Sequence, residues 1–152
     1  MVLNDVLTKQ NVLNPILLKN GDKELSKALK VKIMRMRMAY SKIKKEFDSD
    51  IQEFVDTLLT DEFKELSNKP DKTPEEEARL QELGSNFNLE YQEMLVQKGL
   101  EEVDCKIDDT FTVEEYSDIL DINLDNDVEI NGNKFTAINF MEIVYDLFVK
   151  ED

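Results

Sequence analysis

The stretch that decides the fold is residues 31–58, VKIMRMRMAYSKIKKEFDSDIQEFVDTL. Apolar side chains recur in it every three or four residues, which is the spacing of one face of an α-helix. They form one continuous stripe: Ile33, Met36, Tyr40, Ile43, Phe47, Ile51, Phe54 and Leu58. Because no Gly or Pro stands between Gly21 and Pro70, the pattern predicts one long helix over about residues 22–67.

A second helix is predicted to begin within NKPDKTPEEE, residues 68–77. Thr73 suits the N-cap, Pro74 the first helical position, and Glu76 completes a capping box. Apolar residues at helical spacing follow as far as Gly99, which predicts a helix over about residues 74–99. Two long helices joined by a short loop normally fold back as an antiparallel hairpin.

After about residue 103 the pattern changes to short elements. A brief strand is predicted at Cys105–Phe111, and Thr112 with Glu115 forms another capping box, opening a helix through about Leu120. Asn131-Gly132 lies between two short runs of alternating polarity, which predicts a hairpin with a type I′ turn. An apolar helix is expected over Ala137–Val149.

The fold class is therefore predicted as mainly α: a long antiparallel helix hairpin with a small C-terminal α+β module that contains a β-hairpin. The chain divides into an N-terminal docking segment (1–19), a helical hairpin domain (20–103) and a small acidic module (104–152). Pro15 ends the short helix expected in the first segment. Cys105 is the only cysteine, so no disulfide forms within the chain, and we expect it to be structural.

Charge is distributed unevenly along the chain. The formal net charge is −15, yet no acid stands between Glu24 and Glu46, where eight bases occur. Removing these eight from the 19 bases leaves 11 against 34 acids, a net charge of −23 for the remainder. Such a remainder repels phosphates and acidic membrane surfaces, so nucleic acid is the least favoured partner and no membrane contact is expected.

Catalytic motifs are absent from the sequence. There is no histidine, which removes the commonest general base and metal ligand, and the four glycines stand alone. Residues 121–132 resemble a calcium loop, but Asn126 replaces the central glycine and Gly132 replaces the final glutamate. We therefore expect a protein that is not an enzyme, with no cofactor and no bound metal.

The basic segment is the candidate interaction site. Met34 and Met38 form a side stripe with Val31, which is either buried core or an adaptable partner-binding face. Lys30, Arg37 and Lys44 are seven residues apart, beside the main stripe, where coiled-coil partners place charges. Their acidic partners are expected within the chain, with Glu75 and Glu82 as candidates, or on a neighbouring subunit. The predicted partner-binding residues are Lys30, Arg35, Arg37, Lys42, Lys44, Met34 and Met38.

Residues 20–100 resemble small helical proteins of the head and tail assembly modules of tailed bacteriophages. The resemblance lies in a basic first arm (ELSKALKVKIMRMRMAYSKIKKEFDSDIQEF), a charged loop (SNKPDKTPEEE) and a composition rich in Lys, Asn and Asp. It implies a virion-associated or assembly protein that contacts its own copies or neighbouring virion proteins, as an oligomer or part of a complex. The alternative is a small acidic inhibitor or regulator that binds a basic host protein, as a mimic of nucleic acid. Either protein would be made in the host cytoplasm, and the first would enter the virion.

Overall fold

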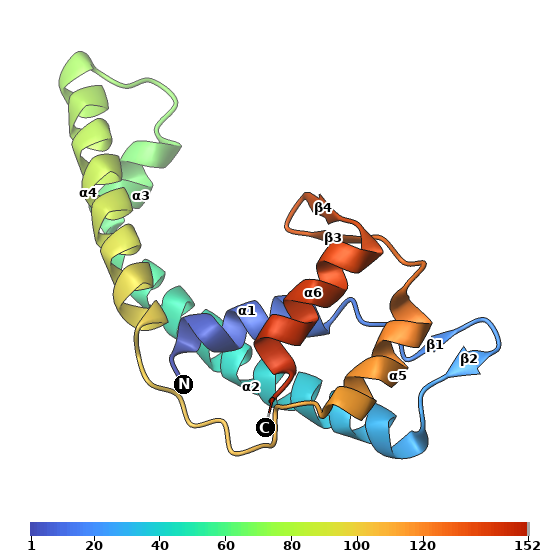
Figure 1. Cartoon of the computed structure of the whole chain (residues 1–152). Helices are drawn as coiled ribbons and strands as arrows, with labels where there is room; N and C mark the ends of the chain where they lie inside the picture. Colours follow the sequence, from blue (N-terminus) through green and yellow to red (C-terminus); the bar gives the residue numbers. More distant parts are fainter. Residues whose placement is uncertain (152) are drawn as a thin grey trace.

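The computed structural model describes residues 1–151, which form a compact head and a projecting arm (Figure 1). The arm consists of the outer half of one long helix and the two helices that follow it. The elements are α1 (Leu3–Leu13), β1 (Lys19–Asn20), β2 (Lys23–Glu24), α2 (Lys27–Leu58), α3 (Asp61–Asn68), α4 (Pro74–Gly99), α5 (Val113–Asn123), β3 (Val128–Ile130), β4 (Asn133–Phe135) and α6 (Ala137–Phe148). The predicted mainly α fold with a small C-terminal α+β module is confirmed.

Helix α2 is shorter at both ends than the predicted helix over 22–67. It begins after Ser26, whose hydroxyl accepts a hydrogen bond from the Leu29 N–H at 3.2 Å, because the residues before it pair as a two-stranded hairpin. It ends at Leu58, and Thr60 caps a separate helix, α3, by accepting from the Phe63 N–H. The prediction of one unbroken helix was wrong because the N-cap at Thr60 starts a separate helix within the predicted range.

Helix α4 begins and ends as predicted. The Thr73 hydroxyl accepts from the Glu76 N–H at 3.2 Å, and the Glu76 carboxylate accepts from the Thr73 N–H at 3.1 Å. The helix runs back from the tip of the arm toward the head, against α3 and the end of α2 (Figure 1). The backbone of Leu3 then donates to the Glu101 carbonyl, so the start of the chain is fixed to the end of α4.

The C-terminal module matches the sequence prediction except at one strand. The β3–β4 hairpin turns at Asn131 and Gly132, whose positive φ angles of 51° and 82° are those of a type I′ turn. Helix α5 continues to Asn123, beyond the predicted end at Leu120. The strand predicted at Cys105–Phe111 does not form, because this segment has no neighbouring strand apart from a single bridge between Phe111 and Val149.

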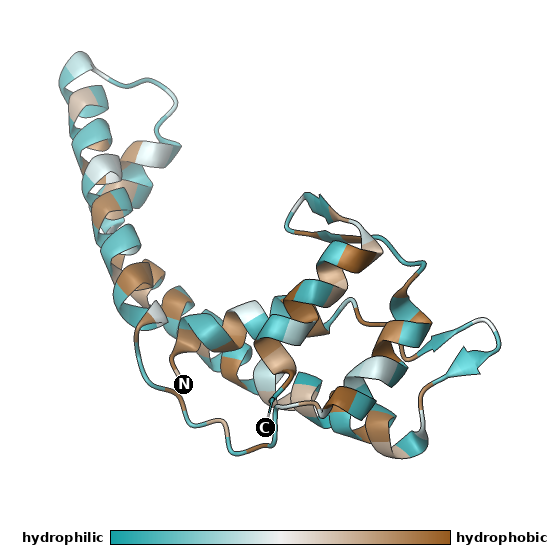
Figure 2. Ribbon diagram, in the orientation of Figure 1, coloured by the Kyte–Doolittle hydropathy of each residue, from teal (hydrophilic) through white to brown (hydrophobic). Residues whose placement is uncertain are grey.

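One hydrophobic core joins the first 40 residues to the C-terminal module. From the long stripe, Ile33, Met36 and Tyr40 are fully buried in the head, among side chains of α1, α5 and α6. The rest of the stripe is only half-buried. Ile43 packs at the edge of the head core, and the later residues lie in the arm, where α2 contacts α4 and the residues are largely hydrophilic (Figure 2). The predicted boundary at residues 103/104 thus separates segments that share a core. No helix within residues 1–151 has the length and apolar character needed to cross a bilayer.

The head contains the same helix–hairpin–helix unit twice. Helix α5 starts at Val113 and α1 at Leu3, 110 residues earlier, while α6 starts at Ala137 and α2 at Lys27, again 110 residues earlier. Ser26 and Thr136 cap the second helix of each unit with their hydroxyls. The two units pack around the common core, and the arm is inserted between them (Figure 1).

Asn123 connects the two units. Its side chain is 1% exposed; its oxygen accepts from the Leu17 N–H at 2.8 Å, and its amide donates to the Leu17 and Ile119 carbonyls. The loop after α1 is therefore held against the last turn of α5. A buried polar side chain with all of these partners present fixes one arrangement of the two units.

Asn123→Ala should lower the free energy of unfolding by about 2–4 kcal/mol, because it leaves buried backbone groups of Leu17 without partners. Urea unfolding followed by circular dichroism measures the change. Asn88→Ala, at an exposed position in α4, is the matched control and should change stability by less than about 0.5 kcal/mol. Equal effects of the two substitutions would contradict the connecting role.

A buried polar cluster fixes the segment between the arm and α5. The Asp109 carboxylate accepts from Lys9 Nζ at 2.8 Å and from the Tyr40 hydroxyl at 3.1 Å. Burial, with the Asp109 charge beside it, raises the pKa of Tyr40 well above its usual value of 10.0. Burial also raises the pKa of the Cys105 thiol in the same segment, which disfavours the nucleophilic thiolate.

Stability should fall as the pH rises above about 10, because Tyr40 loses its proton there in the unfolded chain but keeps it in the folded protein. Its contribution is complete below that pH and is lost above it. Urea midpoints measured between about pH 8 and pH 11 test this. Tyr40→Phe should lose less stability over this interval than the wild type, and parallel pH profiles would refute the assignment.

Candidate partner-binding face on helix α2

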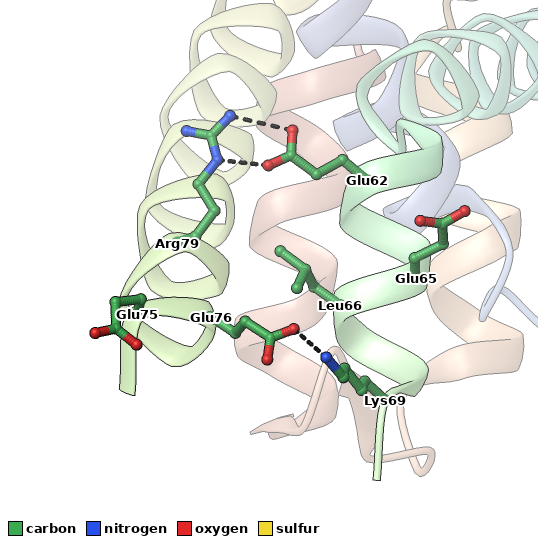
Figure 3. A pocket seen from close by; sticks show the side chains of 7 residues that line it. All are labelled: Glu62, Glu65, Leu66, Lys69, Glu75, Glu76 and Arg79. Carbon is green, nitrogen blue, oxygen red and sulfur yellow. Dashed lines mark hydrogen bonds and ion pairs between the residues drawn. The ribbon is translucent and has the colours of Figure 1, made fainter. Parts of the chain in front are cut away.

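The hollow at the tip of the arm is built from paired charges. It has a volume of about 400 Å³ between α3 and α4 (Figure 3). Arg79 donates to both oxygens of Glu62, at 2.7 and 3.2 Å, and Lys69 donates to Glu76. These bonds lower the pKa of Glu62 and of Glu76, so both carboxylates are held as anions. Such a network fastens α3 to α4 and leaves neither of these carboxylates as a free proton donor.

The calcium-like loop is used for structural contacts. Asp121 pairs with Lys23 of the first hairpin at 3.1 Å, and Asp127 accepts from the Ala137 N–H at 3.0 Å, at the start of α6. The β3–β4 hairpin occupies the second half of the loop. Within residues 1–151, no group of three or more acidic, His or Cys side chains is placed to hold a metal ion.

Helix α2 carries an exposed apolar strip on its outer side. Val31, Met34 and Met38 are 37%, 52% and 70% exposed, and their spacing of three and four residues places them on one face of the helix. This face is separate from the buried stripe of Leu29, Ile33, Met36 and Tyr40. The methionines therefore belong to the surface of the chain, and the prediction of a second buried side is not what the structure shows.

Bases surround this strip. Arg35, Lys27, Lys42 and Lys45 are exposed, and none forms an ion pair with any residue in 1–151. On the helix, Lys27 and Lys45 lie beyond the two ends of the strip, about 27 Å apart. We call the seven residues the methionine face: Lys27, Val31, Met34, Arg35, Met38, Lys42 and Lys45.

The other four bases of the segment are engaged within the chain. Lys30 pairs with Glu24, Lys44 pairs with Asp48 at 2.7 Å, and Lys32 lies 3.0 Å from Glu115 and 3.6 Å from Asp108. Arg37, the fourth, has no carboxylate partner in residues 1–151 and binds backbone carbonyls instead. Glu75 and Glu82, which the sequence suggested as partners of these bases, do not pair with them. Glu82 pairs with Arg79, and Glu75 forms no ion pair with any base in residues 1–151.

Arg37 binds the end of α1. Its guanidinium donates to the carbonyl oxygens of Leu13, Asn14 and Ile16, at 3.2, 3.3 and 2.6 Å. These carbonyls lie at the C-terminus of a helix, where a positive charge is favoured. Burial lowers the pKa of Arg37, although an arginine remains charged at neutral pH. Arg37 therefore holds α1 on α2, which leaves it little freedom to contact a partner.

The structure thus divides the residues predicted from the sequence. Met34, Arg35, Met38 and Lys42 lie together on the methionine face, whereas Lys30, Arg37 and Lys44 have partners within the chain. The sequence prediction missed Lys27 and Lys45 as members of this face. Lys27 precedes Met34 by seven residues and Lys45 follows Met38 by seven, a spacing that places them on the same side of a helix as the methionines.

The chain matches no protein-family model, no curated protein and no solved structure.

Arg37→Met should lower the free energy of unfolding by about 2–3 kcal/mol, because three carbonyls at the end of α1 lose a charged donor. Arg35→Met, two residues away on the exposed face, is the control and should change stability by less than about 0.5 kcal/mol. Thermal and urea unfolding measure both variants. Two equally mild changes would show that Arg37 does not fasten α1.

Proposed function

We propose that this chain is a non-enzymatic protein-interaction component, and that it binds an acidic protein surface through the methionine face. The observation that carries the proposal is the exposure of three adjoining apolar side chains, with four bases at the ends and along one side of them that lack acidic partners in residues 1–151. Apolar surface in the centre with charge at the rim is the composition of protein interfaces.

The chemistry of the face favours protein over nucleic acid. Methionine side chains adapt to the shape of a partner surface, and the surrounding bases select a partner of negative charge. The face has no aromatic side chain on which a base could stack, and the rest of the chain is strongly acidic. An acidic, partly apolar protein surface satisfies both parts of the face.

The setting that we propose is assembly of a tailed bacteriophage particle. It rests on the resemblance of residues 20–100 to small helical proteins of head and tail modules. A small head with a long arm suits such a role, because the arm carries α3 and most of α4 away from the head (Figure 1).

Quantitative mass spectrometry of gradient-purified particles, from a phage that encodes this chain, tests the setting. We expect peptides of the chain in a fixed ratio to the major coat protein, in particles or in isolated heads and tails. An abundant cytoplasmic host enzyme in the same preparation is the control for carry-over. Absence from all of these structures would overturn the assembly role and favour a soluble inhibitor or regulator.

Duplex DNA binding tests the proposed class of partner separately. Binding at about 150 mM salt that is lost in Arg35→Glu would overturn a protein as the partner of the methionine face.

A further inference from the structure

The outer side of α4 carries a second exposed stripe, and this one is acidic. Leu89, Val96 and Leu100 are 60%, 62% and 65% exposed. Glu93 lies between them at helical spacing, and Glu82 lies on the same side nearer the tip of the arm. These large apolar side chains face away from α2 and α3, so the packing of the arm does not account for them.

The acids of this stripe are available for pairing. Glu90 and Glu93 are exposed and form no ion pair with any residue in 1–151. We call the set Glu82, Leu89, Glu90, Glu93, Val96 and Leu100 the α4 stripe. It has an apolar centre with two unpaired acids, Glu90 and Glu93, whereas Glu82 pairs with Arg79. The methionine face has an apolar centre with unpaired bases.

The two surfaces also match in spacing. Val31 and Met38 are seven residues apart, and so are Leu89 and Val96, which is about 10.5 Å along each helix. Helices packed side by side bring apolar residues of this spacing together, with charged residues at the edges. Arg35 follows Val31 by four residues and Glu93 follows Leu89 by four, so the apolar pairs can meet with opposite charges beside them.

We propose that the acidic partner of the methionine face is the α4 stripe of a second copy of this chain. The inference rests on the proposed function, since it names the partner of the same face. The two surfaces differ, and one lies on the head while the other lies on the arm. The contact is therefore head-to-tail, and repetition of it builds a ring or a filament.

A charge exchange between two variants tests this contact. Variant A is Arg35→Glu with Lys42→Glu, and variant B is Glu90→Lys with Glu93→Lys. Variant A then has acids beside the apolar centre of both surfaces, and variant B has bases beside the apolar centre of both, so neither should self-associate. An equimolar mixture should associate, because the unchanged methionine face of B fits the unchanged α4 stripe of A, and the two reversed surfaces also carry opposite charges.

Sedimentation velocity at about 0.1 M salt is the measurement, since at that salt the net charge of each copy is screened beyond about 10 Å. We expect the wild type to associate, each variant alone to do so at least about tenfold more weakly, and the mixture to recover the loss. The control is Lys106→Glu with Lys134→Glu, which makes the same charge change as variant A at exposed positions outside both surfaces and should behave as the wild type.

A wild type that stays monomeric at about 100 μM would overturn the second copy as partner. So would a mixture of A and B that associates no better than each variant alone. Neither result bears on the presence of the chain in purified particles, which tests the proposed function separately. Conversely, self-association of a chain that is absent from particles would support the contact and overturn the assembly role.

Discussion

Helix α2 continues without a break from Lys27 to Leu58, and both the head and the arm are built against it. A helix of this length is stable in water only if its neighbours bury an apolar face. The head fully buries the apolar face of the first half, formed by Leu29, Ile33, Met36 and Tyr40, and the apolar face of the second half is partly buried in the arm. Because the helix is continuous, its backbone hydrogen bonds fix the direction in which the arm leaves the head.

The bases of the basic segment have two roles, and the role of each depends on the side of α2 on which it lies. Bases on the inner sides of α2 hold neighbouring elements: Arg37 holds α1, and Lys32 holds the start of α5 through Glu115. Bases on the outer side surround the exposed methionines. A strongly acidic chain can carry this local positive region because most of its acids lie on other elements, including the arm. The result is a molecule with two oppositely charged surfaces on different helices.

Local signals in the sequence predicted local structure well. The capping boxes at Thr73 and Thr112 mark the starts of α4 and α5, and the Asn131-Gly132 turn marks the second hairpin. The break at Thr60 was missed although the signal was present: a capping residue followed by Asp61 and Glu62, acids that suit a first turn. The strong apolar periodicity on both sides concealed it.

Contacts between distant segments could not be predicted in this way. Nothing near Arg37 in the sequence indicates that it binds carbonyls about 20 residues earlier, and the role of Asn123 depends on Leu17 of the other unit. The candidate face was predicted in part, because exposure of Met34 and Met38 depends on which sides of α2 the head covers. Burial is a property of the tertiary fold, whereas helix and turn formation are largely local.

The shared core has a consequence for the order in which the protein can fold during synthesis. The side chains of Phe140, Val144 and Phe148 complete a core that also contains Val6 and Leu13, made about 130 residues earlier. The ribosome therefore releases α1 and the first half of α2 long before their partners exist. The arm, whose contacts are closer in sequence, can form in the meantime. Until α6 emerges, the core of the head stays open, and α6 then closes it around α1.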